Sequence, residues 1–267
     1  MEKETLHQND QELLEVAVMA GHILLENGAE IARVEETMER ICRYFGAQSE
    51  NFFVLSNGIF VTGNGNFEGQ RGQYAKVQHI PVKGAQLDKV VAVNQLSREV
   101  EEGCYSLEET KEKLEQIKRM PEKSFPVQIL ASGIGSACFC YLLGGSLTDS
   151  AVAFAAGFLL YVFVLSVKKS DMTKITKNIC GGALVTLFCI LCHRLGLGES
   201  LSNMIIGSII PLVPGVAFTN GIRDIADGDY ISGAVRILDA ILVFLCVAIG
   251  VGVMFLIYHR VFGGVLL

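Results

Sequence analysis

Hydrophobic positions divide the chain into two parts with different patterns. In residues 1–123, apolar side chains recur at helical or alternating spacing among charged residues, which is typical of elements with one buried face. In residues 124–267, apolar residues fill long stretches with few interruptions. Because a helix needs about 20 mainly apolar residues to cross a membrane, the pattern predicts a water-exposed domain followed by membrane-spanning helices.

The first part predicts an α+β domain over residues 1–123. Helical periodicity is expected over 11–27, 30–45, 87–101 and 107–119. Ser56-Asn57-Gly58 separates two short apolar runs and predicts a β-hairpin, because Asn and Gly tolerate the backbone angles of a tight turn. A third strand is expected over 74–82, so the domain contains a small antiparallel sheet.

A glycine-rich segment lies between the second and third predicted strands. It contains Gly63, Gly65, Gly69 and Gly72 but lacks the Lys-Ser/Thr pair of a phosphate-binding loop. We interpret it as a loop that connects strands.

The second part, residues 124–267, predicts an α-helical membrane bundle of about five transmembrane helices. The expected spans cover about 125–147, 150–167, 177–194, 201–222 and 237–258. Lysine-rich loops favour the cytoplasmic side, and Lys168, Lys169, Lys174 and Lys177 separate the second span from the third. The first ten residues lack the pattern of a signal peptide. We therefore expect a multi-pass protein of the cell inner membrane, with a cytoplasmic N-terminal domain and the C-terminus outside.

The fourth predicted span contains helix-breaking residues. Pro211, Pro214 and Gly215 free backbone groups from the helical ladder, and such groups are tolerated in a membrane where they are buried in protein or line a wet cavity. Interrupted helices of this kind build transporter substrate sites, while the simpler interpretation is a proline kink.

Polar residues follow this break and continue to the start of the last span. The candidates for a substrate path are Pro211, Pro214, Gly215, Asn220, Arg223, Asp224, Arg236 and Asp239. Arg236 and Asp239 are three residues apart on one helix face. Asp239 either balances Arg236 or acts as a protonatable coupling site whose pKa is raised by desolvation. The alternative is an ordinary cytoplasmic loop with an ion pair at a helix start.

The charge and the cysteine content of the chain argue against several classes of function. Residues 1–123 contain 14 Lys and Arg and 21 Asp and Glu, whereas residues 124–267 contain 8 and 7. The net charge of −6 gives no basic surface for nucleic acid. The eight cysteines lie mostly in apolar segments, and the CxxC of Cys189 and Cys192 has no second pair to complete a zinc site. We find no nucleophile–base set, so no catalytic residue, cofactor or metal is predicted.

Three ordered motifs resemble the threonine/serine exporter family. They are GAEIARVEETM at 28–38, PLVPG at 211–215, and NGIRD at 220–224 with Gly233, Arg236, Asp239 and Ala240. The resemblance covers nearly the whole chain, although full-length members carry a second membrane half that is absent here. It implies the split branch, in which a long subunit pairs with a short membrane subunit and exports a dicarboxylate such as succinate.

The sequence therefore predicts one subunit of a secondary exporter for a small carboxylate, in contact with a short membrane partner and with lipid. The alternative substrates are threonine and serine, which the fused branch of the family implies. A membrane-anchored enzyme with a cytosolic hydrolase-like domain, and a scaffold or sensor, are the competing classes. An enzyme would need a catalytic set that the sequence does not show.

Overall fold

The computed structural model describes residues 2–46, 51–67, 70–81, 84–168 and 170–262. The chain divides into two compact units. The first comprises Met1–Glu122 and Val216–Ile237, and the second comprises Lys123–Gly215 and Leu238–Leu267. The segment Val216–Ile237, which the sequence analysis assigns to the transmembrane part, thus lies in the same unit as the N-terminal domain.

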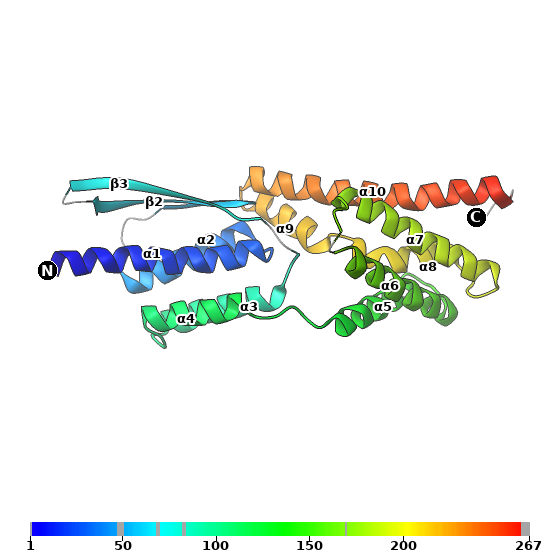
Figure 1. The fold of residues 1–267 in the computed structure, drawn as a ribbon, viewed down its shortest axis with the longest axis horizontal. Helices are drawn as coiled ribbons and strands as arrows, with labels where there is room; N and C mark the ends of the chain where they lie inside the picture. Colours follow the sequence, from blue (N-terminus) through cyan, green and yellow to red (C-terminus); the bar gives the residue numbers. More distant parts are fainter. Residues whose placement is uncertain (1, 47–50, 68–69, 82–83, 169, 263–267) are drawn as a thin grey trace. The chain divides into compact units, whose positions relative to one another are not determined.

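The first unit combines helices with a three-stranded sheet, as predicted. Its helices from the N-terminal part are α1 (Glu2–Glu26), α2 (Ile31–Phe45), α3 (Leu87–Glu101) and α4 (Leu107–Lys118). The strands β1 (Asn51–Leu55), β2 (Gly58–Phe67) and β3 (Gln70–His79) form an antiparallel sheet in the order β1-β2-β3. Figure 1 shows β2 and β3 as a long hairpin beside α1 and α2.

One face of the sheet closes the core of this unit. Val54, Ile59 and Val61 are buried against apolar side chains of α1 and α2, such as Ile23 and Met38. This burial follows the alternation of side chains along a strand.

The opposite face of the same sheet carries an exposed apolar row. Phe53 pairs with Phe60, and Phe60 pairs with Val77, and these three side chains remain exposed.

Three predictions for this unit need correction. Helix α1 begins at Glu2 rather than at residue 11, because polar residues with good helix propensity extend it beyond the apolar pattern. The hairpin is confirmed, but Gly58 pairs with Leu55 as the first residue of β2 instead of lying in the turn.

The glycine-rich segment is the third correction, because it is largely strand. Gly63 and Gly65 belong to β2 and Gly72 belongs to β3, with Gly65 paired to Gly72, while Gly69 lies outside the described residues. Backbone pairing does not need side chains, so the absence of an alternating pattern hid these strand residues.

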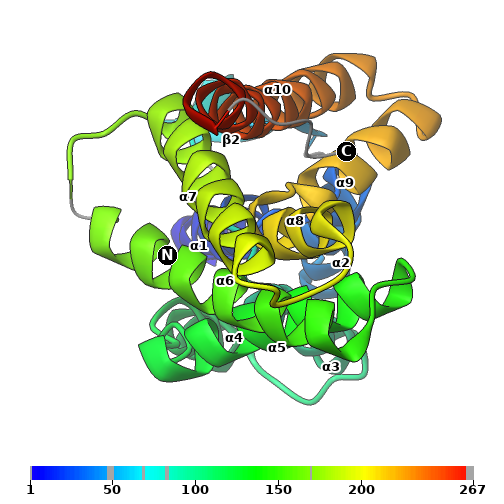
Figure 2. The same cartoon turned by 90° about the vertical axis from the view of Figure 1, so that its right-hand side faces the viewer.

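The second unit is helical. It contains α5 (Phe125–Leu142), α6 (Leu147–Val167), α7 (Lys174–Arg194), α8 (Leu201–Ile209), the short 3₁₀ helix η1 (Ile210–Leu212) and most of α10 (Tyr230–Phe262). Helix α8 packs against α5, α6 and α7 (Figure 2). Buried apolar side chains on these helices, such as Leu160, Val185 and Met204, form a second core.

Four helices of the described chain, α5, α6, α7 and α10, are long and apolar enough to cross a membrane. The predicted span over 201–222 is broken: α8 and η1 end at Leu212, Val213 is extended, and α9 (Gly215–Ala226) follows. Counting the broken pair as one span gives five.

Small residues set the contacts between the membrane helices. Ser132 donates a hydrogen bond of 2.9 Å to the carbonyl of Gly157, and a Cβ at Gly157 would overlap Ser136 Oγ. Likewise, a Cβ at Gly250 in α10 would overlap the carbonyl oxygen of Ile179 in α7. Close approach of backbones is the main way in which helices associate in lipid.

The two glycines of α10 allow a matched test of this packing. A methyl group at Gly250 would also lie 2.9 Å from Ala183 N, whereas one at Gly252 would meet no atom within 4 Å. We expect Gly250→Ala to destabilise the protein by about 1–3 kcal/mol through overpacking. Gly252→Ala should be neutral or stabilising by up to about 1 kcal/mol, because Ala is the better helix former. Thermal unfolding in detergent measures both, and equal effects would contradict the close α7–α10 contact.

Candidate functional site

The turn between α1 and α2 leaves the start of α2 without a cap of its own. Gly28 has φ +81°, and Glu30, the residue before the helix, makes no side-chain capping bond. The first backbone N–H groups of a helix need acceptors from outside the helix. In this protein the acceptor comes from a residue 193 positions later in the chain.

Asp224 in α9 supplies that acceptor. Its Oδ1 accepts a hydrogen bond of 3.0 Å from the backbone N–H of Ile31. A carboxylate at this position also interacts favourably with the helix dipole. Asp224 is 1% exposed, so its charge needs a partner inside the protein.

Arg236 is the partner of Asp224. Its Nη1 donates to Asp224 Oδ2 at 2.8 Å, and its Nη2 donates to the carbonyl of Ala29 at 2.8 Å. One guanidinium therefore bonds both to the carboxylate and to the turn that the carboxylate caps. The Arg236 side chain is 10% exposed, which makes this a buried ion pair.

Two further bonds hold the same turn. Asn220 Nδ2 donates to the carbonyl of Gly28 at 2.7 Å, and Arg223 forms an ion pair with Glu30. We call this set the clasp: the turn Gly28–Ile31 together with Asn220, Arg223, Asp224 and Arg236. It joins the first and third sequence motifs within one compact unit.

A tight helical hairpin positions the clasp residues of α9 and α10. The chain turns at Gly228, which has φ +99°, and the N–H of Asp229 donates to the carbonyl of Asp224 at 2.7 Å. A Cβ at Gly233 would lie 2.6 Å from the carbonyl oxygen of Gly221. Gly221 and Gly233 thus let α9 and α10 approach closely enough for Arg236 to reach Asp224.

Acidic residues beside the clasp carry raised pKa values. Burial raises the pKa of Glu35, which accepts a hydrogen bond from Val54 N, and nearby Asp229 and Glu39 raise it further. Burial also raises the pKa of Asp229, and Asp227 adds to that shift. A raised folded-state pKa means that stability is fully present below the unfolded pKa and is lost as pH rises through the folded pKa. These carboxylates therefore favour the folded state more at mildly acidic pH.

The predicted pairing of Arg236 with Asp239 does not form. Asp239 instead binds Lys174 of α7, with its Oδ2 and Oδ1 at 2.6 and 2.8 Å from Nζ. This pair is half-exposed and lies in the second unit. The structure thus brings Asn220, Asp224 and Arg236 together and places Asp239 elsewhere.

The remaining predicted residues form the break itself. Pro211 lies in η1, Pro214 precedes α9, and Gly215 is its exposed first residue. The N–H of Val213 donates to the carbonyl of Ile210 at 2.9 Å and closes the 3₁₀ turn. Pro211 and Pro214 have no backbone N–H, so neither can continue the helical ladder.

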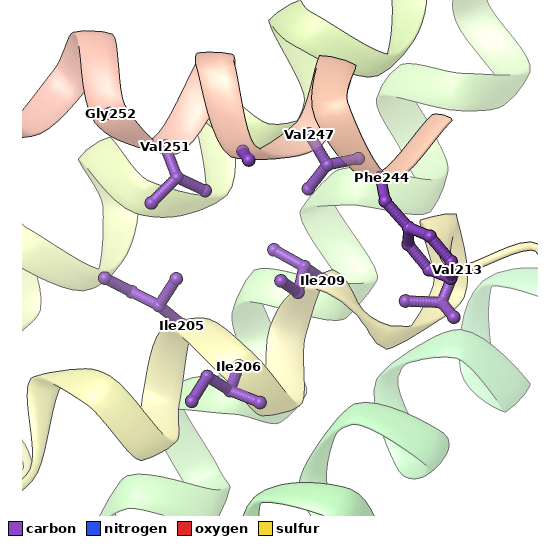
Figure 3. Close-up of a pocket in the computed structure, with 9 residues that line it drawn as sticks. Ile205, Ile206, Ile209, Val213, Phe244, Val247, Val251 and Gly252 are labelled. Carbon is purple, nitrogen blue, oxygen red and sulfur yellow. The ribbon is translucent and has the colours of Figure 1, made fainter. Parts of the chain in front are cut away.

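An apolar groove lies beside the break in the second unit (Figure 3). Its volume is about 360 Å³, and its walls come from α8, Val213 and α10. Ile205, Ile209, Phe244 and Val251 are among the lining residues, all of which are apolar. The groove therefore offers no charged partner for a carboxylate.

No metal-binding group is present in the part of the chain that the structure describes. Three or more His, Cys, Asp or Glu residues do not gather there in an arrangement that could hold an ion. Cys189 and Cys192 are not joined in a disulfide.

The clasp predicts a large difference between two aspartates. In Asp224→Asn the amide oxygen can still accept from Ile31, but the buried charge of Arg236 loses the carboxylate with which it pairs. Removing one partner of a buried pair costs about 3–5 kcal/mol. The matched control is Asp239→Asn, whose exposed pair is worth about 0–1 kcal/mol. Chemical unfolding in detergent compares them, and a similar loss from both variants would contradict the clasp.

Comparison with known proteins places the chain in a family. A family model described as threonine/serine exporter matches residues 15–258. The threonine/serine exporter of Corynebacterium glutamicum is 23% identical over 254 residues, which cover 93% of this chain and 52% of that protein. The chain thus spans about half the length of this relative. No solved structure matches this chain significantly.

Two further relatives are nearer to this chain in length. Proteins named "Probable succinate transporter subunit YjjP" from Klebsiella aerogenes and Escherichia coli K12 are 26% and 24% identical. The matches cover 85% and 88% of this chain, and 87% and 91% of those proteins. The apolar helices and the matched family together indicate a multi-pass membrane protein. The chain belongs to the threonine/serine exporter family.

Proposed function

We propose that this chain is one subunit of a secondary exporter that moves a small carboxylate, such as succinate, out across the cytoplasmic membrane. Its similarity to two named transporter subunits supports this proposal. A short membrane subunit then completes the exporter, and the chain itself is not an enzyme.

The observation that carries the proposal is the broken helix followed directly by the clasp. Transporters commonly build substrate sites where a helix is interrupted, because freed backbone groups can bind ions and polar substrates. Here α8 and η1 end at Leu212, and α9 starts at Gly215 with N–H groups that lack helical acceptors. Pro211, Pro214 and Gly215 shape this point.

Arg223 is the best candidate for binding the substrate carboxylate. It is the more exposed of the two clasp arginines, and its present partner Glu30 is itself a carboxylate. A substrate carboxylate can replace Glu30 with charge-assisted hydrogen bonds of the same type. Asn220, Asp224 and Arg236 then hold α9 in place, and Asp239 with Lys174 forms a second exchangeable pair.

Threonine or serine is the second candidate substrate. The named activity of the C. glutamicum relative favours it. Both substrate classes carry a carboxylate, so Arg223 serves either one. They differ in that an amino acid also brings an ammonium group, for which Glu30 would be the natural partner after exchange.

An export assay tests the function and the role of Arg223. Cells lacking the chain, and cells in which it is restored, are loaded with labelled succinate or labelled threonine, and efflux is followed. We expect restoration to increase efflux of one of them. Arg223→Gln should raise the KM for the exported substrate by about tenfold to a hundredfold, because a bond to a charged group is lost. The abundance of the protein in the membrane should stay normal.

The control for this assay is Arg260→Gln, which changes an exposed arginine at the far end of α10. It should leave efflux unchanged. Wild-type efflux from Arg223→Gln would remove Arg223 from the path. Equal efflux of both substrates with and without the chain would refute export of these compounds.

We also propose five crossings, with the N-terminal unit in the cytoplasm and the C-terminus outside. The lysines between α6 and α7 support this orientation, whereas the α5–α6 connection contains no lysine or arginine.

In a background without the exposed Cys104 and Cys138, a cysteine at Leu147 should react with an impermeant maleimide from outside. A cysteine at Met172 should react only after permeabilisation. The reverse result would invert the topology.

A further inference from the structure

A second buried carboxylate lies in the membrane unit, at the start of α6. Asp149 is 1% exposed. A buried carboxylate needs hydrogen-bond donors around it, and its donors come from two separate parts of the chain.

The first donors belong to its own helix. Asp149 Oδ2 accepts from the N–H of Ser146 at 2.9 Å, and the N–H of Asp149 donates to Ser146 Oγ at 3.1 Å. This reciprocal arrangement is a capping box, which satisfies free N–H groups at the start of α6.

The second donors come from the segment that leads into α8. Asp149 Oδ1 accepts from the N–H of Glu199 at 2.7 Å and from the N–H of Ser200 at 3.1 Å. Ser200 is itself the cap of α8, since its side chain accepts from the N–H of Asn203. One carboxylate thus ties the beginning of α6 to the beginning of α8.

The fit around this carboxylate is close. Gly198 has φ +93°, and a Cβ there would lie 2.8 Å from Asp149 Oδ1 and 2.5 Å from the sulfur of Met204. Backbone N–H groups occupy both carboxylate oxygens. Asp149 is therefore placed to hold two helices together rather than to bind a ligand.

The other end of α8 is built differently. It passes into the 3₁₀ turn of η1 and then into the extended residue Val213. A Cβ at Gly215 would meet no atom within 4 Å. Helix α8 thus has one end fixed by a buried carboxylate and the other end at a proline-glycine break.

We propose that Asp149 is a positioning residue for transport. It holds the Leu201 end of α8 against α6, so that rearrangement of α8 during transport is confined to the break at Val213–Gly215. A few residues at the end of a helix commonly act as a hinge, because they absorb the change in backbone angles when the helix moves. The role in transport rests on the proposed export function, whereas the tie between the helices does not.

The test compares Asp149→Ala, Asp149→Asn and Ser200→Ala. Alanine removes every bond that the carboxylate accepts and keeps only the backbone bond to Ser146 Oγ. Asparagine keeps one carbonyl oxygen, which can face either Ser146 or the Glu199–Ser200 pair but not both. Ser200→Ala is the matched control, because it removes the cap of α8 while leaving the backbone N–H of Ser200 on Asp149.

The first measurement is hydrogen exchange of the Glu199 and Ser200 amides in the purified full chain. We expect exchange about tenfold faster or more in Asp149→Ala, as each bond to a charged group is worth roughly a factor of ten or more. Asp149→Asn should be intermediate, and Ser200→Ala should resemble the wild type. Unchanged exchange in Asp149→Ala would overturn the tie.

The second measurement is efflux of the substrate that the wild-type chain exports, at equal membrane abundance. We expect Vmax to fall about threefold to thirtyfold in Asp149→Ala, the range over which structural couplings act, with KM unchanged. Asp149→Asn should recover part of the rate, and Ser200→Ala should keep it. A normal Vmax in Asp149→Ala, or an equal loss in Ser200→Ala, would overturn the positioning role. Absence of efflux in the wild type would instead refute the proposed function and leave the exchange result to decide the tie.

Discussion

The buried ion pair between Asp224 and Arg236 is the interaction on which the rest of the site depends. Helix α2 starts at a turn with no cap of its own, and Asp224 satisfies its first N–H. Burying that carboxylate requires a cation, and Arg236 provides it while also bonding to Ala29. These bonds make Val216–Ile237 part of the first compact unit, although it follows the membrane helix α8 in sequence.

This arrangement has a consequence for the broken helix. The residues before the break belong to the membrane unit, and those from Val216 onward belong to the unit that contains the sheet. Pro211, Pro214 and Gly215 therefore mark the passage between two compact bodies as well as a kink. In the proposed exporter, Asp149 keeps the other end of α8 in place.

Much of the fold is readable from the sequence because burial leaves a periodic pattern. The positions of α2, α3, α4 and the apolar helices follow from spacing and from charge-free length. The paired glycines of β2 and β3 are not readable, because they form a ladder through backbone groups alone. The early start of α1 was missed for a related reason: its first residues are polar, and only propensity favours a helix there.

The site was predictable only in part. Sequence spacing indicated that Arg236 and Asp239 share a helix face, but each binds a residue from another element, 12 and 65 positions away. Contacts across 193 residues leave no periodic signal. One local sign was present, since the residue before α2 is Glu30 rather than Ser, Thr, Asp or Asn. At this helix the missing local cap is supplied by a distant residue, Asp224.

We infer from these bonds that α9 and the start of α2 behave as one structural body. Native-state hydrogen exchange of the full chain in detergent, with increasing denaturant, tests this most directly. The account predicts that the Ile31 amide and the amides of Gly221–Ala226 exchange through a common opening with the same free energy and the same denaturant dependence. Exchange of α9 at a markedly lower opening free energy, while Ile31 stays protected, would contradict it.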